Sequence, residues 1–298
     1  MDPIIFTIPG TNIALHWYGL IMAVGIIVAG FVAEWGVRKR GEYSDHVWDL
    51  LVWAAPAGII GARLWYVVNE TLGGSRYYLE RPLQILNLPQ GGLHFYGAVL
   101  FGGLGAWFYI RRHDLDFRLV LDAAAPALLI GQAVVRPANF INQELYGPPT
   151  ELPWGISIDA AHRIPPWDNL AQFPVETTRF HPAFAYEMIW NFLATGLILW
   201  LFLEYKKRLK PGSIFYGWLI LEGVGREIIE FFRPDQPRIP GTLISYSRVV
   251  AGVMIVAGVI ALLVQYEIIR LPFLKPGADR YQLSPVAPYR EHEKKKQS

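Results

Sequence analysis

The sequence predicts an all-α integral membrane protein that crosses the bilayer about seven times. Of its 298 residues, 53% are hydrophobic and only 17% are charged, whereas soluble domains carry roughly 25% charged residues. A hydrocarbon core about 30 Å thick requires ~20 mostly apolar residues per helix. Windows of this kind lie at 15–36, 47–68, 93–110, 119–138, 182–204, 212–232 and 247–268.

Basic residues in the short connections predict the orientation of these spans. They follow the odd-numbered spans, as Arg38-Lys39-Arg40, Arg111-Arg112, Lys206-Lys207-Arg208 and, at the end of the chain, Lys294-Lys295-Lys296. Lysine and arginine are concentrated in cytoplasmic loops. We therefore expect the N-terminus outside and the C-terminus in the cytoplasm.

The rest of the chain predicts one polytopic membrane domain, 1–270, and a flexible cytoplasmic tail, 271–298. The longest outer segment, roughly 139–181, is rich in proline, glycine and tryptophan. Loops of this length usually have a function, so we expect a compact, non-helical cap over the outer membrane face.

Composition and motifs exclude several classes of function. The chain has no cysteine, which rules out disulfides, thiolate metal sites and a cysteine nucleophile of its own. A net charge of +2 leaves no broad basic face for nucleic acid. The sequence contains no paired histidine and glutamate spacing for a metal and no phosphate-binding glycine loop, so we expect neither metal nor cofactor.

Charged side chains recur at helical spacing within the sixth predicted span. Glu222, Arg226, Glu230 and Arg233 are separated by four, four and three residues, which places them on one face of a helix. A charge at the centre of a membrane helix costs from ~2.5 kcal/mol upward. These residues form either a self-neutralising ladder of salt bridges that is buried for packing or the polar interior of a functional site. Carboxylates on both sides of Arg226 favour the functional interior.

Further polar residues gather at the outer end of the fourth span, namely Arg136, Asn139, Asn142 and Glu144. We expect Pro137 to interrupt the helix there and to free carbonyl groups near Arg136. Taken alone, Arg136 could simply anchor a helix end at the interface. A guanidinium group suits phosphate because it binds in a fork, so Arg136 and Arg226 together indicate an anionic lipid headgroup.

The remaining candidates lie at the mouths of other spans. His94 and Tyr96 begin a glycine-lined helix, and both types of side chain can move or position a proton. Tyr18 and Tyr96 could instead be interfacial belt residues. Arg63 could serve either helix packing or the site. Glu187 lies inside the fifth span with no charge adjacent in sequence, which is harder to explain by packing.

These motifs resemble, in order and over nearly the whole chain, those of the prolipoprotein diacylglyceryl transferase family. They are His16-Trp17-Tyr18-Gly19, Gly61-Ala62-Arg63, Gly91-Gly92, Arg136 to Gly147 with Asn139-Phe140-Ile141-Asn142 and Glu144, His181-Pro182 with Tyr186-Glu187, and Arg226 to Glu230-Phe231-Phe232-Arg233. The block from Arg136 to Gly147 is the most specific.

The resemblance implies a multi-pass enzyme of the bacterial inner membrane whose site opens to the extracytoplasmic side and to lipid. The expected reaction moves a diacylglyceryl group from phosphatidylglycerol to the lipobox cysteine of a prolipoprotein signal peptide, releasing glycerol phosphate. By position, Arg136 and Arg226 would hold the phosphate, and Asn139, Asn142 and Glu144 would shape the headgroup pocket. Tyr18 and Glu230 would complete the polar lining, with Arg63 and Glu187 in support.

The proton acceptor stays open in the sequence. Tyr96 stands where the family commonly carries a histidine, and His94 lies two residues earlier. Val135 and Pro137 also depart from the usual neighbours of the arginine. Candidates for the acceptor are therefore Tyr96, His94, the phosphate itself or water.

Two other classes of function compete with a transferase. A transporter or channel could line its path with buried glutamate and arginine and a broken helix, but the sequence shows no internal repeat. A noncatalytic lipid-binding subunit would keep the arginines without needing a proton acceptor.

Overall fold

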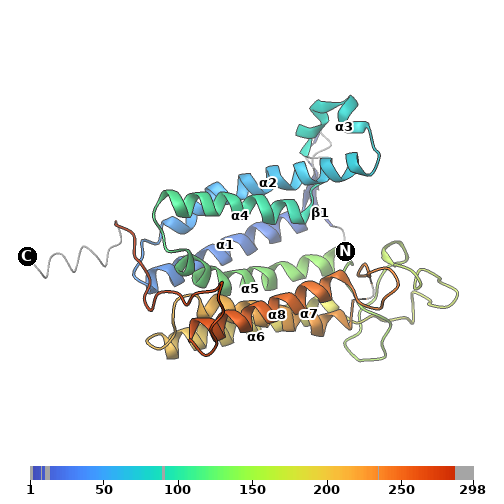
Figure 1. Ribbon diagram of the computed structural model, residues 1–298. Helices are drawn as coiled ribbons and strands as arrows, with labels where there is room; N and C mark the ends of the chain where they lie inside the picture. Colours follow the sequence, from blue (N-terminus) through green and yellow to red (C-terminus); the bar gives the residue numbers. More distant parts are fainter. Residues whose placement is uncertain (1–2, 8, 11–13, 89–90, 234, 286–298) are drawn as a thin grey trace, which may run out of the picture. The chain divides into compact units, whose positions relative to one another are not determined.

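The computed structural model describes residues 3–7, 9–10, 14–88, 91–233 and 235–285. Each predicted span coincides with a helix (Figure 1). These helices are α1 (Trp17–Lys39), α2 (His46–Leu72), α4 (Phe95–Arg112), α5 (Phe117–Ile141), α6 (Ala183–Tyr205), α7 (Ser213–Glu230) and α8 (Tyr246–Gln265). The predicted all-α class is confirmed.

Short elements complete the described chain. Near its start, β1 (Ile4–Thr7) pairs antiparallel with β2 (Ala14–His16). The connection after α2 contains α3 (Tyr77–Glu80) and the 3-10 helix η1 (Pro82–Leu86), and η3 (Ala160–His162) lies in the segment between α5 and α6.

Five of the long helices in the described chain, α1, α2, α5, α6 and α8, are long and apolar enough to cross a membrane. The chain is thus a multi-pass membrane protein. The two shorter helices, α4 and α7, have 18 residues each. Glycine, tyrosine and two terminal arginines dilute the apolar character of α4, and α7 carries four charged residues. That they also cross the membrane stays a prediction.

Contacts divide the described chain into two compact units, a larger one within 1–33 and 121–280 and a smaller one within 34–120 and 281–298. In the smaller unit α2 packs against α4. A Cβ atom added to Gly97 would overlap the carbonyl group of Gly61, so glycine is what allows these two helices to approach so closely.

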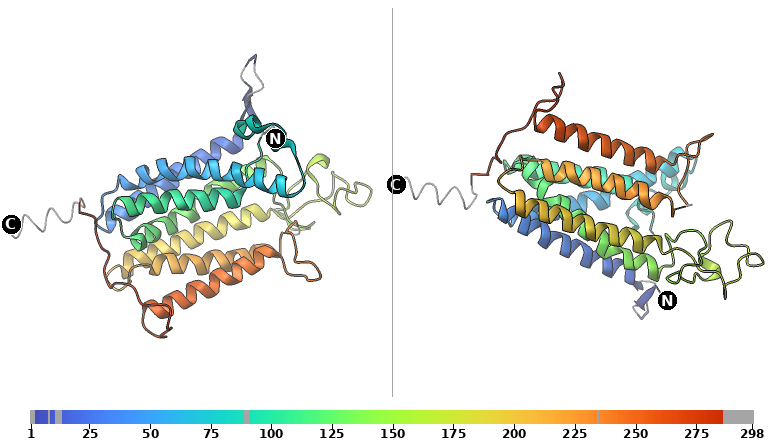
Figure 2. Two further views of the ribbon diagram at one scale, coloured as in Figure 1. Left: turned by 45° about the horizontal axis from the view of Figure 1, so that its top comes forward. Right: turned by 90° about the horizontal axis from the view of Figure 1, so that it is seen from below.

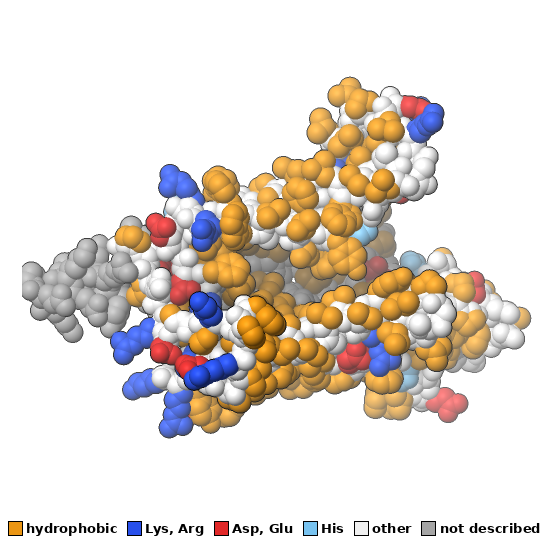
Figure 3. Space-filling model, in the orientation of Figure 1, with side chains coloured by type: hydrophobic (Ala, Val, Ile, Leu, Met, Phe, Trp, Pro, Cys, Tyr) orange, Lys and Arg blue, Asp and Glu red, His pale blue; other side chains and the backbone are white. Residues whose placement is uncertain are grey.

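In the larger unit α7 lies between α6 and α8, with which it makes contact (Figure 2). Small residues again allow the approach, because a Cβ atom on Gly223 would lie 2.6 Å from the carbonyl oxygen of Ala251 in α8. Valines cover the outer side of α8, among them the exposed Val253 and Val256. The visible flank of α8 is correspondingly apolar (Figure 3), as expected of a helix that faces lipid.

The segment between α5 and α6 is compact and mostly irregular, as predicted. Its small core contains Tyr146, Ile158, Trp167 and Phe180, each less than a tenth exposed. The backbone of Phe180 also exchanges hydrogen bonds with Ile156, at 2.8 and 2.9 Å. The position of this segment over the outer membrane face stays a prediction.

The sequence expectation about a helix break is wrong. Pro137 does not interrupt α5, which continues to Ile141; a proline removes only one backbone donor, and flanking turns can keep the helix together. The turn comes later, where Gln143 and Leu145 adopt positive φ angles of 52° and 56°. The flexibility of the tail from residue 271 stays a prediction, and its described first part makes defined contacts.

Those tail contacts occur in both units. In the larger unit Asp279 forms an ion pair with Lys210, with 2.9 Å between Oδ1 and Nζ. In the smaller unit Ser284 is fully buried, and its backbone N–H and its hydroxyl each donate to the Glu42 carboxylate at 2.7 Å. A buried carboxylate must find hydrogen-bond donors, and the tail supplies them.

Candidate functional site

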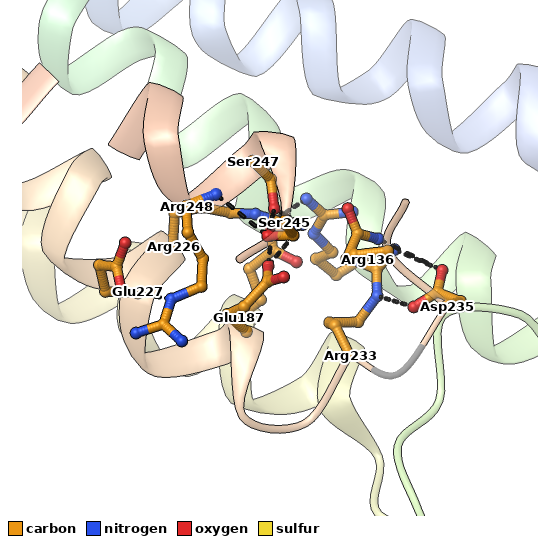
Figure 4. Close-up of polar contacts among 11 residues, drawn as sticks. Arg136, Glu187, Arg226, Glu227, Arg233, Asp235, Ser245, Ser247 and Arg248 are labelled. Carbon is orange, nitrogen blue, oxygen red and sulfur yellow. Dashed lines mark hydrogen bonds and ion pairs between the residues drawn. The ribbon is translucent and has the colours of Figure 1, made fainter. Parts of the chain in front are cut away.

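The larger unit brings polar side chains from four helices into one charged cluster, which consists of two hydrogen-bonded groups (Figure 4). Its main members are Arg136 of α5, Glu187 of α6, Arg226 and Glu230 of α7, and Ser247 of α8. Four of these five were predicted site residues. Helices far apart in the sequence therefore supply one charged cluster within an apolar bundle.

Arg136 is held in place by two partners. Its guanidinium group forms an ion pair with Glu187 and donates through Nη1 to Asn139 Oδ1 at 3.3 Å. The side chains of Arg136 and Glu187 are only 19% and 14% exposed, so solvent screens the pair little. The Nε atom of Arg136 is buried and has no hydrogen-bond partner among the described residues, which leaves one donor for a ligand.

The end of α5 folds back on itself around Glu144. Its Oε1 accepts hydrogen bonds from Asn139 Nδ2 at 2.8 Å and from Asn142 Nδ2 at 3.3 Å. The flanking residues, Gln143 and Leu145, have positive φ angles, and such backbone strain in residues other than glycine tends to be concentrated at functional sites. The predicted headgroup residues thus form one connected block beside Arg136.

Arg226 and Glu230 form a closed triangle with a serine of α8. The Arg226 Nη2 to Glu230 Oε2 distance is 3.2 Å, Arg226 donates to Ser247 Oγ at 3.1 Å, and Ser247 donates to Glu230 at 2.7 Å. Sequence reasoning missed Ser247. It follows Ser245, which caps α8 by accepting the Arg248 N–H at 3.2 Å, and serine at a helix start is too common to indicate function.

The charged row of α7 is not a continuous ladder. Glu222 accepts a long hydrogen bond of 3.5 Å from Gln132 and makes no ion pair with Arg226 among the described residues. Arg233 pairs instead with Asp235, at 2.8 and 2.9 Å. Burial opposes ionisation of Asp235, but the Arg233 guanidinium outweighs it and holds the pKa of that carboxyl below its ordinary value. The structural ladder interpretation therefore fails at Glu222.

A small cavity of about 10 Å³ adjoins this network, lined by Glu187, Trp190, Asn191, Glu222, Gly225, Arg226 and Ile229. Its volume holds about one water molecule. An interior this polar within a membrane bundle is expensive unless it binds something. The cavity therefore belongs to the candidate site, since Glu187 and Arg226 both line it.

A second polar group joins the connection before α6 to the first turn of that helix. The ring nitrogen Nδ1 of His181 lies 2.9 Å from the Tyr186 hydroxyl, which also accepts from Trp154 Nε1 at 2.8 Å. Burial lowers the pKa of His181, so its neutral form is favoured. Gly147 donates its N–H to the His181 carbonyl at 2.8 Å. A Cβ atom added to Gly147 would lie 2.9 Å from the Cβ atom of His181, so a side chain at this position would crowd the histidine.

Arg63, in the smaller unit, is committed to backbone carbonyls. It is 4% exposed, and its guanidinium donates to the carbonyl oxygens of Gln84, Ile85, Asn87, Gly91 and Gly92. These contacts hold the connection between α2 and α4. They favour the packing interpretation of Arg63.

The other candidates of the smaller unit lie at the start of α4. His94 precedes the first helical residue, and its ring centroid lies 5.4 Å from that of Tyr96. Tyr96 is 61% exposed. Tyr18 belongs to the larger unit, half-buried in the first turn of α1. Among the described residues, no hydrogen bond joins Tyr18 to the network of Arg136.

Comparison with known proteins decides the family. The sequence profile described as Prolipoprotein diacylglyceryl transferase matches residues 3–264. The chain belongs to this family. It is 37% identical to a phosphatidylglycerol–prolipoprotein diacylglyceryl transferase of Chloroflexus aggregans over 78% of each chain. It is equally identical to proteins of that name from Leifsonia xyli, over 91% of this chain and 80% of the relative, and Lysinibacillus sphaericus, over 84% and 88%.

Membership in the prolipoprotein diacylglyceryl transferase family confirms the resemblance seen in the sequence motifs. The matched range includes every candidate residue from Tyr18 to Glu230. Nothing in the comparisons supports a transporter. The two ion pairs, Arg136–Glu187 and Arg226–Glu230, thus belong to the charged interior of a diacylglyceryl transferase family member.

Proposed function

We propose that this protein transfers the diacylglyceryl group of phosphatidylglycerol to the thiol of the lipobox cysteine of prolipoproteins, the first step of lipoprotein maturation. The observation that carries the proposal is the pair of largely buried arginines, Arg136 and Arg226, each held by a carboxylate within an apolar helix bundle. The relatives named above bear names that specify phosphatidylglycerol and prolipoprotein as substrates.

The proposed chemistry is a displacement at carbon. The cysteine sulfur attacks the glyceryl carbon that carries the phosphate, so that a C–S bond forms and the C–O bond to phosphate breaks. The bonding electrons leave with the phosphate oxygen as glycerol phosphate, and the thiol proton goes to an acceptor. Arg136 and Arg226 stabilise the negative charge that builds on the departing oxygen, an effect that is strongest where water is excluded.

The carboxylates and amides have positioning roles in this scheme. Glu187 and Glu230 orient the two guanidinium groups and offset their charge while the site is empty. An arriving phosphate competes with them for the same donors. Asn139, Asn142 and Glu144 form the connected block that shapes the headgroup pocket, and Tyr18 adds to the polar lining.

A transfer assay tests the proposal directly. Purified protein in detergent micelles containing phosphatidylglycerol is mixed with a lipobox peptide, and the peptide mass is followed. We expect the mass to increase by one diacylglyceryl group, and a peptide with serine in place of cysteine to stay unmodified. Ion or solute flux through protein-containing vesicles, without peptide modification, would favour a transporter instead.

We also propose that the protein resides in the bacterial inner membrane with its site toward the extracytoplasmic side. Reporter fusions are expected to place residues 40 and 209 in the cytoplasm and residue 155 outside, because the basic loops follow odd-numbered spans. A cytoplasmic signal from the fusion at 155 contradicts this topology.

Tyr96 is proposed to orient the headgroup through its hydroxyl rather than to act as the obligatory base. A thiol has an unperturbed pKa of ~8.5 and needs little help once cations surround it, whereas tyrosine titrates near ~10. Tyr96→Phe should therefore transfer more slowly but keep the wild-type shape of its rate against pH. Tyr96→His and His94→Ala are measured beside it. Complete loss in Tyr96→Phe with full recovery in Tyr96→His would show that proton transfer at this position is essential.

A further inference from the structure

A second cavity, of about 190 Å³, lies where α7 ends and α8 begins. Three arginines line it, Arg233, Arg238 and Arg248, together with Gln236, Glu230 and apolar side chains. All of these residues belong to the larger unit. The volume is below the ~300–1,000 Å³ of pockets for drug-sized ligands, which suits a small polar molecule.

The charges in this cavity favour an anion. Arg233 is paired with Asp235, and Arg248 is paired with Glu227 at 3.0 Å. Among the described residues, Arg238 has no carboxylate within ion-pair distance. Its guanidinium is therefore available to a ligand.

The carboxylate that faces the cavity is already engaged. Glu230 accepts from Arg226 at 3.2 Å and from Ser247 at 2.7 Å. Arg226, Arg233 and Arg248 each have a carboxylate partner among the described residues, so the excess positive charge at the cavity is that of Arg238. Gln236 adds an uncharged hydrogen-bonding group to the same wall.

The Arg226–Glu230 ion pair contributes one residue to the lining of each cavity. Arg226 lines the small cavity together with Glu187, whereas Glu230 lines the large cavity together with Arg233. Arg226 therefore contacts a residue, Glu230, that also lines the arginine-rich cavity.

We infer that the large cavity binds a phosphate group, and that it receives the glycerol phosphate released by the transfer. The assignment to product rests on the proposed function. Guanidinium groups match phosphate oxygens in fork geometry. A phosphate monoester carries about −1.5 to −2 charges at pH 7, whereas the diester headgroup of phosphatidylglycerol carries one, so an arginine-rich cavity favours product over substrate.

The test measures binding of sn-glycerol 1-phosphate to the purified full-length protein by calorimetry, which needs no turnover. Arg238→Gln and Arg248→Gln should each weaken binding about tenfold or more, the factor expected for loss of one charge-assisted contact. The matched control is Arg179→Gln, since Arg179 is exposed in the same unit and its guanidinium, among the described residues, donates only to Thr178 and Ser157. It should bind as wild type does.

Turnover measurements then identify the occupant. In Arg238→Gln we expect the inhibition constant of added glycerol phosphate to rise in parallel with the dissociation constant. Weakened binding of a short-chain phosphatidylglycerol, with glycerol phosphate unaffected, would keep a phosphate site but overturn its assignment to product.

Two results overturn the inference altogether. Unchanged binding of both ligands in both variants is one, and tighter binding of an acidic peptide than of glycerol phosphate is the other. A wild-type protein that binds glycerol phosphate but modifies no lipobox peptide would leave the anion cavity in place and remove the proposed function. The two proposals therefore fail separately.

Discussion

Replacing Arg136 or Arg226 by alanine should reduce diacylglyceryl transfer by about 100-fold or more, the loss typical when a donor to a developing oxyanion is removed. Each substitution removes a charge-assisted phosphate contact from a largely buried network. Each also leaves a carboxylate, Glu187 or Glu230, without its cation, and an unpaired buried charge is costly. The rate of peptide modification, at matched levels of folded protein, measures the effect.

Lysine variants sharpen this expectation. Arg136→Lys and Arg226→Lys keep the charge but lose the two-pronged geometry, so we expect poor recovery of the rate. Arg179→Ala, on the exposed connection before α6, serves as the control and should transfer normally. Near-normal turnover in either alanine variant of the buried pair would remove the phosphate role from that arginine.

Gly225→Val is expected to abolish activity through the packing of α7 on α6. A Cβ atom at Gly225 would overlap the indole nitrogen of Trp190, which donates to the Leu221 carbonyl at 3.1 Å. Inserting a branched side chain into such a contact costs about 1–3 kcal/mol or more. Because Arg226 is the next residue, separating the helices also displaces its guanidinium. Thermal unfolding in detergent and the transfer rate measure the two consequences.

The same helix provides a matched control for that substitution. A Cβ atom at Gly217 meets nothing within 4 Å, so Gly217→Val should unfold and transfer much as the wild type does. Equal melting temperatures for the two valine variants would show that the close approach at Gly225 is unimportant.

The membrane-spanning helices could be predicted from the sequence because each depends on a continuous stretch of about 20 mostly apolar residues. The windows at 93–110 and 212–232 proved to be helices although both are weakly apolar. The error at Pro137 has a different origin. Whether a proline breaks a membrane helix depends on what surrounds it, and the sequence alone does not show those neighbours.

Charged residues of the candidate site could be predicted from the sequence, whereas residues that join it only through tertiary contacts could not. Arg136, Glu187, Arg226 and Glu230 stand out because ionisable residues are rare in membrane spans. Ser247 is an ordinary residue until α8 packs on α7 and brings its hydroxyl to Glu230.

The large arginine-lined cavity was hidden for the same reason. Arg238 and Arg248 lie outside the charged row, and only folding brings them to one cavity with Arg233. The tail contact of Ser284 with Glu42 spans 242 positions in the chain, which no local pattern predicts.

The most direct test of the proposed transfer follows the bridging oxygen of phosphatidylglycerol. The lipid is labelled with ¹⁸O at the atom that joins the diacylglyceryl carbon to phosphorus, and the products are separated and weighed by mass spectrometry after reaction with a lipobox peptide. Displacement at carbon predicts that all of the label leaves in glycerol phosphate and that the modified peptide carries none. Label retained on the diacylglyceryl product, which requires cleavage of the P–O bond, would contradict the mechanism.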